Sequence, residues 1–247
     1  MHRSARTAGC WRRKLNKRMK QGARVSSHMF ADRKDAGQKL ARALENYREQ
    51  KPLVLAIPKG GVEVGYEVAT HLGCEFSILV ARKLPFPDNP EAGFGALAED
   101  GSTVILDYAA RGLSADAIGH IIAKQHEEIQ RRVAALRRGK PLPQIVNRVV
   151  ILIDDGIAMG STMRAGISLC KNQKASKIVV ASPVAGPDTA ADLAKIVDEV
   201  VILETPAYFR AVAQVYANWY DVSDEEVVQL METWDRPDRN APVHPGH

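Results

Sequence analysis

Short continuous runs of apolar residues alternate with amphipathic segments through most of the chain. An unbroken apolar run of strand length is typical of a strand buried on both faces, as in a parallel sheet. The predicted strands are Pro52–Ile57, Phe76–Ala81, Arg148–Ile153, Lys177–Val184 and Glu199–Leu203.

Between these runs, apolar residues recur every three or four positions, which predicts helices that pack one face on a sheet. Asp32 and Ser114 are suited to cap two of these helices, and Gly73 is suited to end another. Strands alternating with helices predict an α/β fold, an open parallel sheet with flanking helices and right-handed crossovers. The predicted helices are Asp32–Gln50, Val62–Gly73, Ser114–Gly139, Thr162–Gln173 and Asp188–Ile196.

The segment Arg82–Ser102 differs in composition from the predicted strands and helices, because it holds three prolines and three glycines. Alternation of apolar residues is confined to the part near Phe94–Ala98. A segment of this length inside a compact domain is typically functional or mobile. We therefore expect a long flexible loop or an irregular hairpin, followed by a returning strand over Thr103–Asp107.

Charge divides the chain into two parts. Residues 1–28 hold nine Lys and Arg and no Asp or Glu, so removing them from the net charge of +5 leaves about −4 for residues 29–247. We expect residues 1–28 to be a disordered basic tail, with Met29 as an alternative start; a transit peptide or a nucleic-acid arm would have the same composition. Residues 29–204 are the expected core, and residues 205–247 a small aromatic-rich C-terminal cap with a frayed end.

Composition argues against several classes of protein. No apolar run approaches the ~20 residues that cross a bilayer, so we expect no membrane partner. Cys10, Cys74 and Cys170 show no paired spacing, which argues against a disulfide framework or a zinc site and indicates a reducing, cytoplasmic compartment.

The stretch VVILIDDGIAMGSTM, Val149–Met163, ends a predicted buried strand on two adjacent carboxylates, Asp154 and Asp155. Two adjacent negative charges repel each other and raise the free energy of the folded protein, unless a cation or several hydrogen-bond donors interact with them. The small residues that follow let backbone N–H groups point toward a ligand, and they lead into a helix N-terminus, a usual phosphate site. Carboxylates accept hydrogen bonds from the vicinal hydroxyls of a sugar, or reach a metal. The stretch therefore predicts a site for a ribose 5-phosphate.

Two further loops are expected at the same edge, since ligands of open parallel sheets bind beyond the carboxyl ends of the strands. In PKGG, Gly60 and Gly61 permit close backbone approach, and Lys59 adds a positive charge. Arg82 and Lys83 open the long segment and could clamp a second anion. Each of these features alone is typical of a solvated turn, so the prediction rests on their combination.

In this combination the sequence resembles the type I phosphoribosyltransferases. The family's pattern of four apolar residues, two acids and a loop close to T-G-x-T is matched by Val150–Ile153, the two aspartates and Met159–Thr162. IPKGG looks like the family's pyrophosphate loop, and Arg82–Ser102 looks like its flexible catalytic loop. The resemblance covers roughly Asp32–Glu204 and is closest to stand-alone members with RKL…NPE…GA.AE in that loop, whose substrate is undefined.

The resemblance implies that a 5-phosphoribosyl group moves from 5-phosphoribosyl 1-diphosphate (PRPP), with Mg²⁺, to a nitrogenous base, or the reverse, with release of pyrophosphate, as in nucleotide salvage. The metal would be held mainly by PRPP, with direct ligation by Asp154 or Asp155 left open. The peptide bond before Lys59 can be cis in relatives, and a homodimer is open by the same analogy. The implied site residues are Asp154, Asp155, Arg82 and Lys83 for catalysis; Ala158, Met159, Gly160, Ser161 and Thr162 for the 5-phosphate; and Lys59, Gly60 and Gly61 for pyrophosphate.

Two positions depart from the family pattern. Met159 stands where the family usually carries Thr, so one phosphate-binding hydroxyl is missing unless Ser161 replaces it. Ala158 stands where 6-oxopurine enzymes carry an acid, which argues against hypoxanthine or guanine as the acceptor. Tyr208 and Phe209 are candidates for stacking on a base, with packing inside the cap as the alternative.

Two other functions stay open from the sequence. A non-catalytic PRPP-binding regulator would use the basic arm to bind nucleic acid in a salt-dependent way, whereas an enzyme has no need of nucleic acid. The Arg82-Lys83 pair favours the enzyme, because a sensor has less need of a leaving-group clamp. A hydrolase that uses water as acceptor is the third reading. Glu99 is either an acceptor-orienting group or, as we expect, a solvated loop acid.

Overall fold

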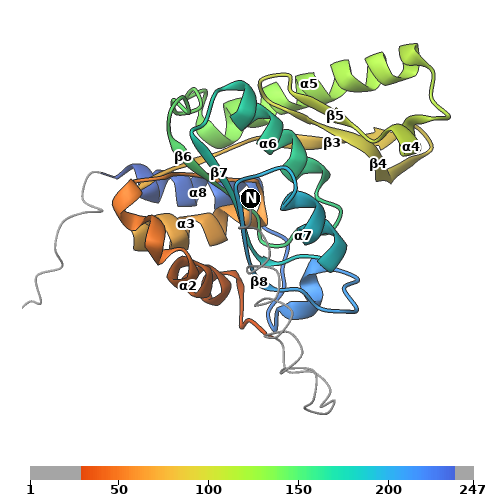
Figure 1. Ribbon diagram of the computed structural model, residues 1–247. Coiled ribbons are helices and arrows are strands. Elements are labelled where there is room, and N and C mark those ends of the chain that lie inside the picture. The colour runs from red at the N-terminus through yellow and green to blue at the C-terminus, as the bar shows by residue number, and fades with distance from the viewer. Residues whose placement is uncertain (1–28, 237–247) are drawn as a thin grey trace, which may run out of the picture.

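The computed structural model describes residues 29–236, so the predictions for residues 1–28 and 237–247 lie outside the described residues. The main sheet has five parallel strands in the order β2-β1-β6-β7-β8 (Figure 1). The predicted α/β fold with an open parallel sheet is confirmed. The strands are β1 (Leu53–Ala56), β2 (Glu75–Ile78), β6 (Val149–Ile153), β7 (Lys177–Val184) and β8 (Glu199–Glu204).

Successive side chains of the central strands enter two separate hydrophobic layers, as the two-residue period of a strand requires. Val54 and Ala56 of β1 are fully buried in one layer, and Leu53 and Leu55 are fully buried in the other. Burial on both faces explains why these strands read as unbroken apolar runs.

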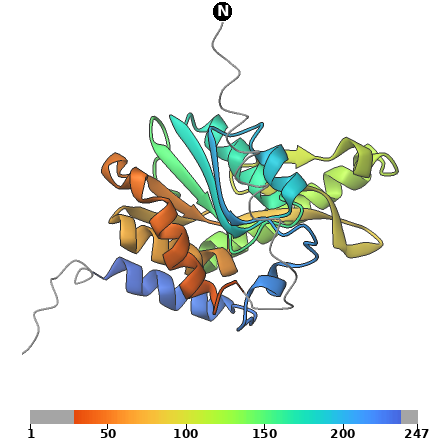
Figure 2. The ribbon, with the colours of Figure 1, turned by 60° about the horizontal axis from the view of Figure 1, so that its bottom comes forward.

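Helices cover both faces of the main sheet (Figure 2). On the Val54 face lie α2 (Arg33–Ala43), α3 (Gly60–Leu72) and α8 (Asp224–Asp235). On the opposite face lie α6 (Ser161–Asn172) and α7 (Pro187–Leu193). Since α3 and α6 each follow a parallel strand, their N-termini meet at the carboxyl edge of the sheet.

The structure confirms the helix caps that were predicted from the sequence. Asp32 and Ser114 cap their helices by accepting hydrogen bonds from the backbone N–H three residues later, at 2.8 and 3.2 Å. Gly73 ends α3 with φ at 64°, in the left-handed region that favours glycine. The helix predicted over Asp32–Gln50 is divided into α2 and a 3-10 helix, η1 (Glu45–Gln50).

A second, antiparallel sheet projects from the main one and is backed by a long helix (Figure 1). We call this unit the hood. It consists of β3 (Ala81–Phe86), β4 (Asn89–Ala98), β5 (Thr103–Ile105), α4 (Asp107–Ala110) and α5 (Ala115–Arg137).

The hood refines two expectations. The second predicted strand ends at Ile78 rather than continuing to Ala81, which begins β3 in the other sheet. Arg82–Ser102 forms the irregular hairpin and not an open loop, because Leu84 and Phe94 are fully buried in the layer that includes α5. The proline in β3 lies at a register shift of this edge strand, where a missing N–H is tolerated.

After β8 the chain passes near the carboxyl edge of the sheet before forming α8. Residues 205–223 include the 3-10 helix η2 (Val212–Val215), after which Tyr216 forms a parallel bridge with Phe30. The helix α8 packs on α3 and α5 rather than across the sheet edge. None of the helices within residues 29–236 has the length and apolar character to cross a membrane.

Candidate active site

A cavity of about 620 Å³ opens between the hood and the loop that joins β6 to α6. It brings together residues that lie far apart in the sequence, since Lys83, Phe86 and Tyr108 of the hood face the β6–α6 loop across it. The site residues predicted from the sequence that line this cavity are Lys83, Asp154, Ala158, Met159, Gly160, Ser161 and Thr162.

The β6–α6 loop is held through its carbonyl groups. Thr189 Oγ1 donates to the carbonyl of Ala158, and Arg164 Nη1 donates to the carbonyl of Met159, each at 2.7 Å. Gly160 caps α6 with φ at 70°. Because side chains engage these carbonyls, and the first N–H groups of a helix lack intrahelical partners, the loop offers mainly donors to the cavity. That arrangement suits an anion such as a phosphate.

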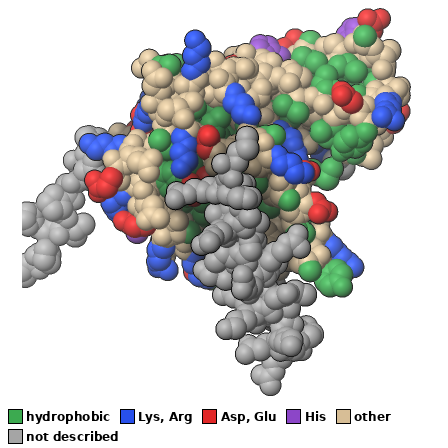
Figure 3. All heavy atoms as spheres, viewed as in Figure 1, with side chains coloured by type: hydrophobic (Ala, Val, Ile, Leu, Met, Phe, Trp, Pro, Cys, Tyr) green, Lys and Arg blue, Asp and Glu red, His purple; other side chains and the backbone are tan. Residues whose placement is uncertain are grey.

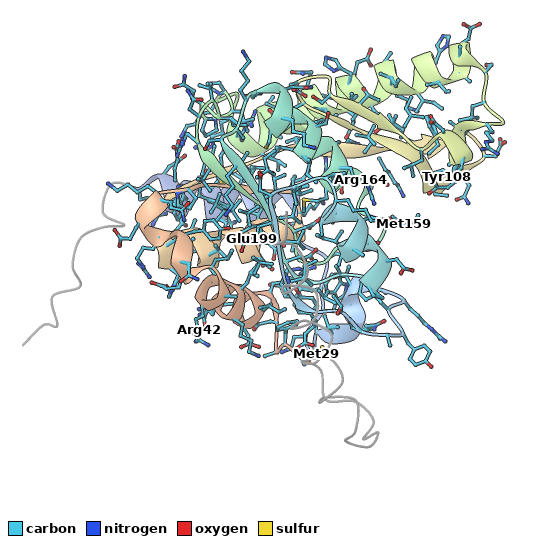
Figure 4. The ribbon with its side chains drawn as sticks, in the orientation of Figure 1. Met29, Arg42, Tyr108, Met159, Arg164 and Glu199 are labelled. Carbon is cyan, nitrogen blue, oxygen red and sulfur yellow. The ribbon has the colours of Figure 1, made fainter. Side chains whose placement is uncertain are left out.

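The side chain of Met159 is not needed for this arrangement. It is 66% exposed and lies on the same side of the molecule as Tyr108 of the hood, which is equally exposed (Figure 4). Hydrophobic side chains gather on this part of the hood surface (Figure 3). A methionine at this position therefore leaves the backbone donors of the loop in place.

The two adjacent acids have different surroundings. Asp154 lines the cavity, and its Oδ1 accepts the backbone N–H of Asp155 at 2.9 Å. Burial raises the pKa of the Asp154 carboxyl well above its ordinary value, and the neighbouring charge of Asp155 raises it further. The Asp155 carboxyl does not line the cavity and pairs with Arg33, whose Nε donates to Oδ2 at 2.7 Å.

The surroundings of Arg33 were not predicted from the sequence. Its guanidinium lies over the Trp219 ring at 4.1 Å and donates to the carbonyl of Tyr220 at 2.9 Å. The hydroxyl of Tyr216 donates to the carbonyl of Asp155 at 2.6 Å. The aromatic stretch YANWY, which we expected to be part of a small cap over the sheet, thus contacts the backbone and the ion pair of the acids.

The PKGG loop lies beside the cavity, at the start of α3. The Pro58–Lys59 peptide bond is cis. A Cβ on Gly61 would lie 3.0 Å from the Cα of Asp154, so this glycine allows α3 to approach the end of β6. The ammonium of Lys59 pairs with Asp224 at the first turn of α8, at 3.2 Å.

Arg82 and Lys83 point to opposite sides of β3, as neighbours in a strand must. Lys83 lines the cavity. Arg82 instead donates through Nε to Gln125 at 2.8 Å and lies 3.6 Å from Glu128, both on α5. Burial lowers the pKa of Arg82, and the nearby Arg132 adds to this effect. The structure therefore places one of the two cations at the cavity and not the other.

The predicted base-stacking residues do not line the cavity. Tyr208 is 89% exposed, and Phe209 packs on the small cluster around Phe30 and Val215. The aromatic rings that do face the cavity are Phe86 and Tyr108 of the hood. No short-range signal in the sequence separates these rings from core aromatics.

Glu99 is not the solvated loop acid that we expected, and it does not line the cavity. Its side chain is 10% exposed and forms an ion pair with Arg137, which is 4% exposed. It also accepts the backbone N–H of Val80 at 2.9 Å. Burial raises the pKa of Glu99 in spite of the nearby guanidinium. This pair joins the end of α5 to the junction between the two sheets.

Within the part of the chain that the structure describes, no group of three or more His, Cys, Asp or Glu side chains is arranged to hold a metal ion. A permanent metal cage is therefore not a feature of residues 29–236.

Comparison with known proteins relates this geometry to a family. Two proteins of Mycobacterium tuberculosis, from strains CDC 1551 and H37Rv, carry the provisional name of phosphoribosyl transferase. Each is 42% identical to this chain over 206 residues, which is 83% of this chain and 46% of theirs. The chain thus spans about half the length of these curated relatives.

A solved structure shows the same fold at a similar level of identity. The crystal structure of TT1426 from Thermus thermophilus is 37% identical, with a TM-score of 0.72, and the match covers 83% of this chain and 98% of that one. The profile of the phosphoribosyl transferase domain matches residues 28–217, which include every predicted site residue. This chain belongs to the phosphoribosyl transferase domain family.

Proposed function

We propose that the protein transfers a 5-phosphoribosyl group from PRPP to a nitrogenous base, or the reverse, with pyrophosphate as the second product. One observation carries the proposal: a half-buried acid, Asp154, and the donor-rich N-terminus of α6 share one cavity. A sugar hydroxyl needs the first, and a sugar phosphate needs the second. Family membership supports the same reaction class.

The chemistry asks the protein mainly to position groups and neutralise charge. The transition state has cationic character at the ribose C1, and negative charge grows on the departing diphosphate. Asp154 accepts hydrogen bonds from the ribose hydroxyls and favours the cationic sugar. Ala158–Thr162 hold the 5-phosphate, and Lys59, Gly60 and Gly61 face the diphosphate. Lys83 adds a cation from the hood.

The side chains at this cavity fit Mg²⁺ only if a bound substrate supplies further ligands. This ion usually binds through one or two carboxylates plus substrate phosphates and keeps several waters. Residues 29–236 offer no cluster of three or more ligating side chains, so the diphosphate of PRPP would supply much of the coordination. Bound in that way, Mg²⁺ would neutralise part of the leaving-group charge.

Calorimetric titration of the full chain with PRPP, with and without Mg²⁺, tests the proposal. We expect binding that depends on Mg²⁺, followed by pyrophosphate release with at least one member of a panel of purine, pyrimidine and other nitrogen bases. Pyrophosphate released without a base would support a hydrolase. PRPP binding without release would support the regulator, whose nucleic-acid binding should be lost on deleting residues 1–28. Absence of PRPP binding contradicts the proposal.

Changing Met159 to threonine should alter PRPP affinity by less than about threefold. The side chain is 66% exposed, and Thr189 and Arg164 hold the loop through its backbone carbonyls, so we expect a hydroxyl at this position to stay in water and to form no hydrogen bond with the phosphate. Calorimetry on both proteins measures the difference. A gain of about tenfold or more would show that the loop binds phosphate through side chains.

Changing Asp224 to asparagine should tighten pyrophosphate binding by about two- to fivefold. Asp224 is 43% exposed and pairs with Lys59, and releasing an exposed pair of this kind is worth about 0.2–1 kcal/mol. Titration with Mg-pyrophosphate reports the change. Glu225→Gln removes an exposed charge from the same helical turn and serves as the control, so an equal gain in both variants would contradict a specific effect on Lys59.

A further inference from the structure

We infer that Arg33 is a positioning residue of this site: it fixes Asp155 against the PKGG loop and so leaves Asp154 as the acid that faces the cavity. The inference deepens the proposed function and rests on it for the identity of the ligand. Arg33 acts through Asp155, because Asp154 lines the cavity whereas Arg33 and Asp155 do not.

Arg33 is more deeply buried and more fully partnered than an incidental ion pair requires. Its side chain is 3% exposed, although it is the first residue of α2. Nε donates to Asp155 at 2.7 Å, and Nη1 donates to the carbonyl of Tyr220 at 2.9 Å and lies 3.6 Å from Glu63. A buried guanidinium with this many partners has a fixed position, and it fixes the carboxylate that it contacts.

The Arg33–Asp155 pair lies directly against the PKGG loop. A Cβ built on Gly60 would lie 1.9 Å from Asp155 Oδ2 and 2.6 Å from Arg33 Nε. The pair therefore touches the backbone that is proposed to receive the diphosphate. Because Asp155 follows Asp154 directly, one ion pair sets the relative position of the sugar side and the diphosphate side of the site.

The C-terminal aromatic stretch closes the arrangement from the other side. The guanidinium stacks on Trp219 at 4.1 Å, while the Tyr220 hydroxyl donates to Glu63 at 2.6 Å. The carbonyl of Asp155 accepts the hydroxyl of Tyr216 at 2.6 Å. Residues from α2, α3, the β6 end and the stretch 216–220 thus converge on one guanidinium, which has the rigidity that a positioning role demands.

The first test needs no ligand. Amide hydrogen exchange is compared for the wild type, Arg33→Met, Arg33→Lys and the control Arg42→Met, which removes an exposed cation from the same helix (Figure 4). We expect exchange in residues 58–64 and 154–156 to be about tenfold faster in Arg33→Met, smaller acceleration in Arg33→Lys, and none in Arg42→Met. Unchanged exchange at these two segments in both Arg33 variants overturns the inference.

The second test uses PRPP and Mg-pyrophosphate as separate titrants. Loss of the ion pair with Asp155 should lower the affinity of Arg33→Met for each titrant by about tenfold or more. Arg33→Lys should recover part of this affinity. A purely structural role would lower the melting temperature without changing affinity below it, and that result overturns the inference. If Arg33→Met does not fold, Arg33→Lys decides, because lysine keeps the charge but cannot donate in two fixed directions.

The two tests separate this inference from the proposed function. Faster exchange in a protein that never binds PRPP or pyrophosphate would support the positioning role while the proposed function fails. Normal PRPP binding by the wild type and by both Arg33 variants would leave the proposed function standing and overturn the positioning role.

Discussion

Replacing Asp154 with asparagine should weaken PRPP binding about 100-fold and, at the same time, stabilise the free protein at pH 8. Asp154 is the carboxyl that lines the cavity. Each charge-assisted hydrogen bond to a ribose hydroxyl is worth about 1.5–3 kcal/mol, and 1.4 kcal/mol is a factor of ten in affinity. Calorimetric titration with Mg-PRPP measures the loss.

The gain in stability follows from linkage. Burial and the charge of Asp155 raise the pKa of Asp154 in the folded protein. The folded state therefore holds this proton more tightly than the unfolded chain, in which an aspartate has a pKa of about 3.9. Stability falls as the pH rises from about 4 through the raised pKa, because the half-buried carboxyl ionises next to Asp155. Asparagine avoids this cost, so the melting temperature should exceed that of the wild type at pH 8 and converge with it near pH 4.

The matched control is Asp155→Asn, which removes the same charge from the neighbouring position. This change leaves the buried Arg33 without its 2.7 Å partner, so it should lower the melting temperature where Asp154→Asn raises it. Equal shifts of the same sign in both variants would contradict the division of roles between the two acids. Equal shifts would also contradict our proposal that the Asp154 carboxylate, at the end of β6, binds a ligand through its charge.

The sheet and the course of the β6–α6 loop could be predicted because their signals are local. The run before Asp154 is apolar at every position, since β6 is buried on both faces, and the small residues after it need no partner from elsewhere in the chain. The same holds for Gly73, whose positive φ ends α3 without any tertiary contact. Patterns of this kind can be recognised in a single sequence because each depends on only a few neighbouring residues.

Contacts between distant segments could not be read in the same way. Arg33 and Asp155 are 122 positions apart, and an arginine near a helix start is usually exposed. Arg82 and Lys83 look equivalent as neighbours, but once β3 is recognised as a strand they must face opposite sides. The hood itself was ambiguous because its prolines and glycines resemble those of a loop, whereas Leu84 and Phe94 are buried only when α5 is in place.

Changing Glu99 to alanine should cost about 3–5 kcal/mol of folding free energy, a large fraction of what holds a domain together. Glu99 pairs with the buried Arg137, which also donates to the carbonyl of Ile78 at 2.9 Å. Removing the acid leaves a nearly buried guanidinium without its counter-charge at the junction of hood and sheet. The midpoint of urea unfolding measures the loss, provided that the slope of the transition is unchanged.

An exposed ion pair elsewhere in the protein provides the control for this buried ion pair. Glu75 also pairs with an arginine, Arg148, but it is 49% exposed, so Glu75→Ala should cost less than about 1 kcal/mol. The double variant Glu99→Leu/Arg137→Met should regain most of the stability lost in Glu99→Ala, because a buried ion pair often stabilises no more than apolar residues of similar volume. If Glu99→Ala costs no more than Glu75→Ala, the pair does not hold the hood to the sheet, and apolar packing around Leu84 and Phe94 must do so alone.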